Sequence, residues 1–210
     1  MSVADIFTEQ EIDPDTLANL GPLRRLAGVW EGSKGADVNP KADGPERSVF
    51  FERIELQPID AQSNGPQLLY GLRYHAHIVK PTEAITFHDQ VGYWLYEPAT
   101  GLIMQTLGIP RGQVALASGR AAPDGSIKVS ARRGSTENGI ASTAFLEQAF
   151  TTLSYEIEVT FHDNGSWSYS EDTVLQVQGR AEPFHHIDSN TLTKVAEPTR
   201  NPLVLALASA

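Results

Sequence analysis

Apolar side chains recur at every second position along most of this chain, which is the spacing of a β-strand with one buried face. The clearest example covers residues 153–161, where large apolar side chains alternate with polar ones. An Asp-Asn-Gly-Ser turn at 163–166 then leads into a second alternating run at 167–178. Because Asn-Gly between two such runs is the strongest short-range hairpin signal, we predict two antiparallel strands here.

The same period predicts more strands, separated by turn residues about every ten positions. No helical crossover pattern lies between them, and closing such a sheet on itself removes its exposed edges. We therefore predict an all-β fold, an antiparallel up-and-down β-barrel of about ten strands, comparable to a lipocalin. Besides the hairpin above and a strand that begins near Trp30, the expected strands are 49–56, 68–79, 90–96, 102–109, 114–118, 127–132 and 190–195.

The chain before the first strand has helical rather than β spacing. Asp and Thr residues at 13–16 precede leucines at 17, 20, 23 and 26, with Gly21-Pro22 between them. Asp and Thr cap a first helical turn, and proline cannot continue a helix. Residues 1–22 are expected to form a short helical segment over one barrel mouth. With a barrel core at about 23–196 and a tail at 197–210, we predict a single domain for the 210 residues.

Two other segments stand apart from the strand pattern. Residues 37–45 are rich in Asp, Asn, Pro and Gly, so we expect a surface loop, and its length makes it a candidate gate to the barrel. Residues 203–208 are apolar but much shorter than the roughly 20 residues that span a bilayer. This run is expected to pack on the body or on a second subunit, which makes a homodimer one expectation.

Composition excludes several classes of function. The net charge of −10 argues against nucleic-acid or anionic-membrane partners, which require clustered Lys and Arg. With no cysteine, the chain has no disulfide, thiolate metal site or Cys nucleophile. The first residues lack a secretory signal pattern, so cytoplasmic residence is expected. The motifs of common hydrolases, kinases and dehydrogenases are not found in the sequence.

Six histidines remain as candidates for chemistry. His75 and His77 share one strand face with Arg73, and such a pair can bind a metal ion as in cupins. The carboxylate that cupins place shortly after the second histidine is missing, however, so the alternative is a solvent-exposed basic face. His162 is expected at the surface because it continues the polar face of its strand.

His88 and the pair His185-His186 lie beside aromatic or apolar residues. A histidine that enters an apolar barrel is either a hydrogen-bonded packing residue or an axial ligand to iron. Both roles stay open on these residues alone.

Three short motifs, in this order, resemble those of the nitrobindins, a family of haem-binding barrels related to fatty-acid-binding proteins. The resemblance covers roughly residues 23–195. The motifs are Gly28-x-Trp30-x-Gly32 with a third glycine displaced by one to Gly35, His88-Asp89-Gln90-Val91-Gly92-Tyr93, and His186-Ile187-Asp188-Ser189-Asn190-Thr191-Leu192 with Leu192 one position late.

The resemblance implies a ten-stranded antiparallel barrel that holds haem b. It implies His186 as the proximal iron ligand and His88 as the catalytic residue on the distal side, with Gly28, Trp30 and Gly32 bordering the pocket. Since side chains alternate faces along a strand, the displacement at Leu192 leaves open whether His186, His185 or neither faces the cavity.

The chemistry that the resemblance implies is nitric oxide binding and the isomerisation of peroxynitrite to nitrate at ferric haem. The alternative from another class is a non-catalytic carrier of a small apolar or fatty-acid-like ligand. A cupin-like metal enzyme that uses His75 and His77 is a third hypothesis.

Overall fold

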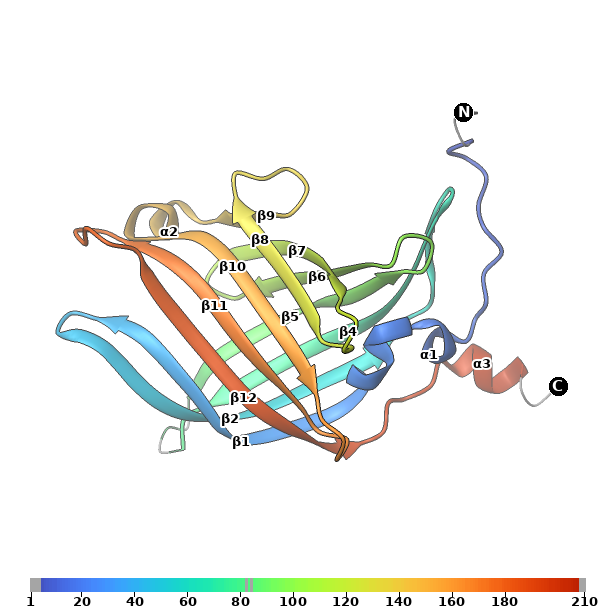
Figure 1. Cartoon of the computed structure of the whole chain (residues 1–210), viewed down its shortest axis with the longest axis horizontal. Helices are drawn as coiled ribbons and strands as arrows, with labels where there is room; N and C mark the ends of the chain where they lie inside the picture. Colours follow the sequence, from blue (N-terminus) through green and yellow to red (C-terminus); the bar gives the residue numbers. More distant parts are fainter. Residues whose placement is uncertain (1–4, 82, 84, 208–210) are drawn as a thin grey trace.

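The chain folds into a β-barrel, seen in a computed structural model that describes residues 5–81, 83 and 85–207 (Figure 1). The strands are β1 Gly28–Lys41, β2 Gly44–Pro58, β3 Gln62–Asn64, β4 Gln67–Val79, β5 Thr86–Glu97, β6 Leu102–Ile109, β7 Gln113–Ala121, β8 Ile127–Arg133, β9 Gly139–Ser142, β10 Phe150–Phe161, β11 Trp167–Val177 and β12 Phe184–Ala196.

Within the described residues the ring contains eleven strands, in the order β2-β1-β12-β11-β10-β8-β9-β7-β6-β5-β4, and pairing of β2 with β4 closes it. Ten of these strands are long and antiparallel. The four-residue β9 runs antiparallel to β7 and parallel to β8, and the short β3 pairs with β4. The predicted all-β barrel of about ten strands is confirmed.

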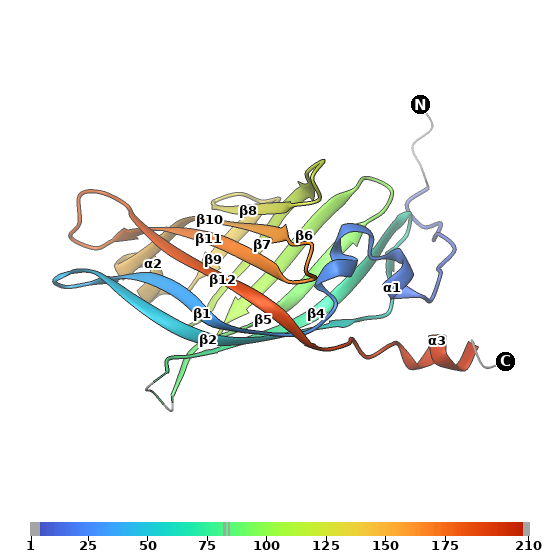
Figure 2. The same ribbon diagram turned by 60° about the horizontal axis from the view of Figure 1, so that its bottom comes forward.

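Two short helices lie at one end of the barrel, which we call the capped end (Figures 1 and 2). They are α1, Thr16–Asn19, and the 3-10 helix η1, Gly21–Leu26. The Asp15 side chain accepts a hydrogen bond from the Ala18 amide and so caps α1. Leu20, Leu23 and Leu26 are buried in the core. The predicted short helical segment over one barrel mouth is confirmed, but its helices span 16–26 rather than 1–22, and residues 5–15 are not helical.

The opposite end, which we call the hairpin end, is formed by the β1–β2 turn, the β11–β12 turn and helix α2, Ala144–Ala149 (Figure 1). The prediction of a surface loop at 37–45 is wrong, because these residues continue β1 to Lys41 and begin β2 at Gly44. The two strands pair here from Asp37↔Ser48 to Lys41↔Gly44. Polar residues that are typical of loops sit here in strands because their side chains bond each other across the sheet, as Ser48 does with Asp37.

Helix α3, Pro202–Leu207, follows the last strand and extends from the capped end in both views (Figures 1 and 2). Leu205 is 47% exposed, so the structure does not show it packed into the barrel core. Ala208 lies outside the described residues, and the homodimer stays a prediction. No helix among the described residues is long and apolar enough to cross a membrane.

Candidate functional site

A cavity of about 480 Å³ lies inside the barrel between the capped end and the hairpin end. Lys41, Arg111 and Phe145 belong to its lining at the hairpin end, and Leu26 and Trp167 at the capped end. Much of the wall between is apolar. The larger apolar side chains of that wall include Phe50, Ile78, Phe87, Leu107, Ile109, Phe150 and Leu175.

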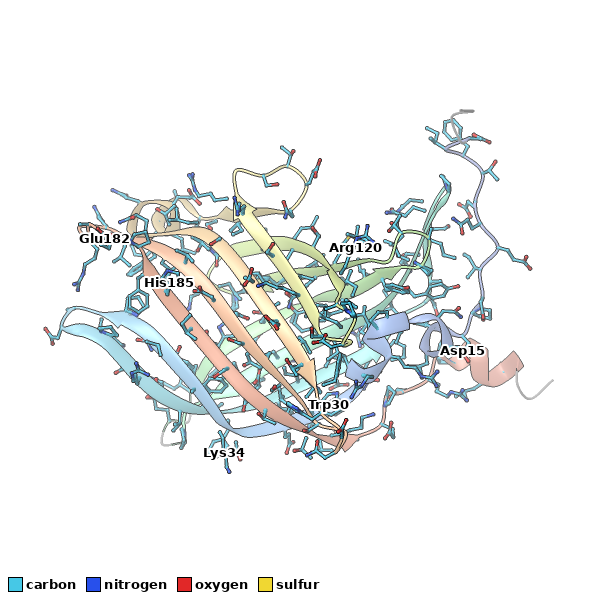
Figure 3. All side chains as sticks on the ribbon, in the orientation of Figure 1. Asp15, Trp30, Lys34, Arg120, Glu182 and His185 are labelled. Carbon is cyan, nitrogen blue, oxygen red and sulfur yellow. The ribbon has the colours of Figure 1, made fainter. Side chains whose placement is uncertain are left out.

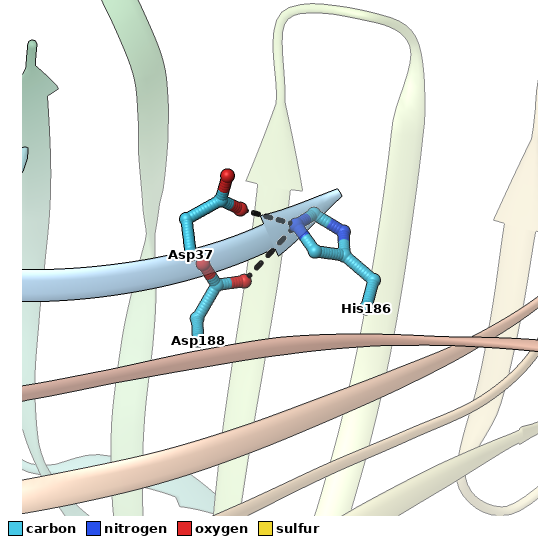
Figure 4. A group of neighbouring side chains, drawn as sticks. All are labelled: Asp37, His186 and Asp188. Atoms are coloured by element: carbon cyan, nitrogen blue, oxygen red, sulfur yellow. Dashed lines mark hydrogen bonds and ion pairs between the residues drawn. The ribbon is translucent and has the colours of Figure 1, made fainter. Parts of the chain in front are cut away.

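Three titratable side chains from two neighbouring strands meet on the cavity wall (Figure 4). Nε2 of His186 lies 2.8 Å from Oδ1 of Asp37 and 3.3 Å from Oδ2 of Asp188. The Asp37 side chain is 1% exposed, and those of His186 and Asp188 are 29% and 20% exposed. We call these three residues the Asp-His-Asp cluster.

Strand pairing explains why the Asp-His-Asp cluster forms. β1 and β12 are antiparallel neighbours, and Asp37 is the register partner of Asp188. His186 is two positions before Asp188, so both side chains project from the same face of β12. The cluster therefore joins residues almost 150 positions apart, which no local pattern brings together.

The three groups of the cluster shift one another's protonation. Although burial favours the neutral acid, hydrogen bonds from His186 and Asn39 hold the pKa of Asp37 below its ordinary value. Burial also opposes the charge on His186, but its hydrogen bond to Asp37 and the negative charge of Asp188 raise the pKa of His186. Burial, with the nearby Glu171 carboxylate, raises the pKa of Asp188 to about 8. These shifts favour a charged carboxylate on Asp37 and the neutral acid on Asp188, and they favour a proton on His186 that a bound metal would displace.

A second polar group begins at His88 in β5 and follows the barrel wall. Nε2 of His88 lies 3.2 Å from Oε1 of Gln90, and Nε2 of Gln90 donates to the Tyr74 hydroxyl at 2.7 Å. Tyr155 donates to Oε1 of Gln105 at 2.9 Å, and Gln105 reaches the Tyr74 hydroxyl. Since the Gln90 amide nitrogen donates to Tyr74, its oxygen accepts, so His88 carries its proton on Nε2. Burial lowers the pKa of His88, which keeps it neutral.

Two further carboxyl groups line the middle of the cavity. Oε2 of Glu52 accepts from Tyr169 at 2.9 Å and from Asn190 at 2.9 Å, and Tyr155 lies 3.2 Å from Oε2 of Glu171. Burial raises the pKa of each acid to about 7. No lysine or arginine in the described part of the chain forms an ion pair with either acid, so burial is not offset by a positive partner.

Of the two adjacent histidines, His186 lies on the cavity wall and His185 lies outside. Nδ1 of His185 is 2.7 Å from Oδ2 of Asp172, and its side chain is 60% exposed. This is the alternation that a strand imposes on successive side chains. The structure thus places one of the two candidates, His186, where it can meet a bound group.

The glycine-flanked tryptophan lies at the capped end, far along the barrel from His185 (Figure 3). Trp30 is 1% exposed, packs edge-on against Trp167 at 5.9 Å and donates from Nε1 to the Leu26 carbonyl. Neither Trp30 nor Gly28 nor Gly32 is among the residues that line the cavity. A Cβ on Gly32 would lie 2.4 Å from the Asn190 side chain, so this glycine gives Asn190 its space.

His75 and His77 project from the outer face of β4, as the solvent-exposed alternative predicted. They bond Asp89 and Thr86 respectively. The Asp-His-Asp cluster is the group of three close potential metal ligands found among the described residues. Neither His75 nor His77 belongs to it. His162 is half-buried and bonds Ser168.

Sequence reasoning missed the four carboxyl groups of the cavity. Glu52 and Glu171 occupy inward positions of alternating strands, where an acid among apolar residues is itself a usable signal. Asp188 is two residues after His186 and shares its face. Asp37 gave no such signal because its segment has the composition of a loop.

The residues present fit a haem group in their chemistry. The cavity has the size and the mostly apolar wall of a small-molecule site. Its wall carries a histidine bonded to a carboxylate, the pairing that metal-ligating histidines use to fix their ring. The bond to Asp37 uses Nε2 of His186. Nδ1 of His186 has no hydrogen bond to any described residue, so this nitrogen is available to bind iron.

The chain is similar to a family of haem-binding barrels in sequence and to a solved structure in fold. The profile of the THAP4-like, heme-binding beta-barrel domain matches residues 19–194. The crystal structure of Rv2717c from M. tuberculosis is similar in fold, with a TM-score of 0.59 and 19% sequence identity over 88% of this chain and 99% of that chain. No curated protein matches the sequence.

Proposed function

Because the chain belongs to the family of THAP4-like, heme-binding β-barrel domains, we propose that its cavity binds haem b and that His186 is the iron ligand. The observation that carries this proposal is the inward position of His186 on β12, backed by the Asp37 carboxylate at 2.8 Å. A carboxylate partner raises the basicity of a ligating imidazole and holds its ring in place.

The hairpin end of the cavity suits the polar edge of a haem. Lys41 and Arg111 line it there, and their positive charges favour the two carboxylates that haem carries. The apolar side chains Phe87, Ile109 and Phe150 favour its flat hydrocarbon surface. These contacts support binding of an amphipathic ring at this end.

A more specific proposal concerns the reaction at a bound haem and the role of His88 in it. Ferric haem would supply a Lewis-acidic iron able to take nitric oxide or the peroxynitrite anion. His88 also lines the cavity and is neutral, with its proton fixed on Nε2 by Gln90. We propose that His88 contacts a molecule bound to the haem and so promotes isomerisation of peroxynitrite to nitrate.

Titration of the purified apoprotein with hemin tests haem binding. We expect a Soret band shifted from that of free hemin at one equivalent, and loss of that shift in His186→Ala. His185→Ala is the matched control, because it removes the neighbouring histidine that faces outward. No shifted band, or an equal loss in His185→Ala, would contradict the assignment.

Stopped-flow decay of peroxynitrite tests the role of His88. We expect the hemin-loaded protein to accelerate the decay with nitrate as product, and His88→Ala to slow it by about tenfold or more. An unchanged rate in His88→Ala that still carries hemin would remove His88 from the chemistry.

The second candidate function is a carrier of an apolar or fatty-acid-like ligand. The apolar wall favours it, and Lys41 and Arg111 at the hairpin end would attract the carboxylate of a fatty acid as they would those of haem. Charge on the wall therefore does not separate the two candidates. Mass spectrometry of ligands extracted from the native protein distinguishes the carrier from the haem-binding protein. A fatty acid recovered at one equivalent would favour the carrier.

A further inference from the structure

We infer that the Asp-His-Asp cluster, Asp37, His186 and Asp188, is a binding site for a divalent transition-metal ion such as Zn²⁺. This site goes beyond the proposed haem function and does not depend on it. Its ligand atoms would be Oδ1 of Asp37, Nε2 of His186 and Oδ2 of Asp188.

The separations of these atoms suit one shared ion. Zinc binds imidazole nitrogen and carboxylate oxygen at about 2.0–2.2 Å, so two ligands of a tetrahedral or octahedral ion lie about 3–3.5 Å apart. Nε2 of His186 lies 2.8 Å from the Asp37 oxygen and 3.3 Å from the Asp188 oxygen. All three ligand atoms lie within 4.8 Å of one another. Only small side-chain adjustments separate this arrangement from a three-ligand site.

Asp37 is held in the orientation that a ligand needs. Its second oxygen, Oδ2, accepts from Nδ2 of Asn39 at 2.6 Å and from the Ser48 hydroxyl at 3.1 Å. These bonds leave Oδ1 directed at Nε2 of His186 (Figure 4). Ligating carboxylates in metal sites are typically fixed by such outer hydrogen bonds.

Apart from His186, the two acids of the cluster have no positive partner, because no lysine or arginine among the described residues forms an ion pair with Asp37 or Asp188. The charge of Arg111 is near enough to oppose a positive charge on His186. The carbonyl oxygen Oδ1 of Asn39 is buried and has no hydrogen bond, which is uncommon for a polar atom in a native protein. Asn39 also lines the cavity. Two acids beside one imidazole, with no lysine or arginine partner, favour a bound cation, and the unpaired Asn39 oxygen lies two residues along the same strand from Asp37.

The donor set indicates the class of ion. Imidazole suits zinc, iron, nickel and copper, whereas carboxylates suit harder ions such as manganese, so one nitrogen and two oxygens favour a borderline divalent ion. Three protein ligands beside a cavity leave coordination positions for water or a small molecule, as in catalytic rather than structural zinc sites.

Metal titration of chelator-treated apoprotein, without hemin, tests the site. We expect calorimetry to show one equivalent of Zn²⁺ bound, and Co²⁺ to give visible absorption bands that Zn²⁺ removes. His186→Ala should abolish binding, and Asp188→Asn should weaken it by about tenfold or more. His185→Ala is the matched control, because it removes an exposed histidine with its own carboxylate, Asp172, at 2.7 Å. Its affinity should equal that of the unmodified protein.

No Zn²⁺ binding by the unmodified protein overturns the proposal, as does binding that His185→Ala weakens as much as His186→Ala. If circular dichroism shows that His186→Ala does not fold, Asp188→Asn decides, since it replaces one oxygen ligand without a change of shape. An unchanged affinity in folded Asp188→Asn would also refute the site.

Failure of this proposal and failure of haem binding give different results. Zn²⁺ binding with no Soret shift would refute the haem proposal alone, and a normal Soret shift with no Zn²⁺ binding would refute the metal site alone. If both bind, preloading with Zn²⁺ should slow hemin uptake in the unmodified protein, because a neutral imidazole with Zn²⁺ on Nε2 carries its proton on Nδ1, the nitrogen left for iron.

Discussion

The same strands run through both ends of the barrel, but their inward side chains differ in chemistry between the capped end and the hairpin end. At the capped end, inward side chains such as Trp30, Trp167 and Leu192 pack against each other beneath η1. Toward the hairpin end, inward positions of the same strands carry Asp37 and His186 beside the cavity. One alternating pattern thus builds a packed core at one end and a polar site at the other. The two-residue period of a strand predicts which side chains point into the barrel. Whether such a side chain packs in the core or lines the cavity depends on the residues around it.

Truncation at the capped end is expected to have the largest effect on stability. Trp30→Ala should lower the free energy of unfolding by about 3–5 kcal/mol, because it removes a buried ring and leaves a cavity. Urea denaturation measures this change. Phe145→Ala, at the hairpin end and 67% exposed, is the control and should cost less than about 1 kcal/mol. Similar losses of stability at the two positions would contradict the view that the packed core lies at the capped end.

Glu52 is expected to make stability fall as pH rises. Its pKa is about 7 in the folded protein, against 4.5 for the free side chain, so the folded state binds more protons between these values. Its stabilising contribution is full below pH 4.5 and is lost as pH rises through about 7, a difference on the order of 3 kcal/mol. Denaturation at pH 5 and pH 8 measures it, and Glu52→Gln should reduce the difference, with Glu171 and Asp188 accounting for the rest. A profile unchanged by this substitution would show that Glu52 is not a buried neutral acid.

Asp37→Asn should destabilise the hairpin end by about 2 kcal/mol at pH 6, because hydrogen bonds to a charged group are stronger than those to a neutral one. It should also lower the pKa of His186, which NMR titration of the imidazole detects. Asp172→Asn is the matched control, since it alters the exposed pair with His185. That control should cost less than about 1 kcal/mol.

Asp188→Asn is expected to have the smallest effect on stability. Burial raises the pKa of Asp188 to about 8, so at pH 6 the acid is neutral and asparagine has nearly its shape. The free energy of unfolding at pH 6 should change by less than about 1 kcal/mol. A loss at pH 6 as large as that of Asp37→Asn would show that Asp188 is ionised instead.

Local patterns predicted most of the fold because they depend on neighbouring residues. The hairpin at 153–178 was predicted from its alternation and its Asn-Gly turn, and the structure has β10 and β11 there. The cap followed from leucine spacing and Gly21-Pro22. The segment 37–45 was predicted wrongly for the same reason. Its loop-like composition concealed two strands that long-range pairing holds together.

The site was predictable only in part. The motifs selected His88 and His186, and both line the cavity, but they also selected Trp30, which packs in the core at the other end. The resemblance identified positions in the chain without showing which residues surround them. Glu52 and Glu171 were visible as acids at inward positions, whereas the partners that bury them come from other strands.

An all-β barrel with a helical cap follows from the sequence alone, since a two-residue period and turn residues are local properties. The choice between His185 and His186 needed the folded structure, because the register of β12 against β1 and β11 sets which face each side chain takes. The folded structure also brought Asp37 to His186 across 149 positions. That contact depends on closure of the whole ring, and closure is a property of all the strands together.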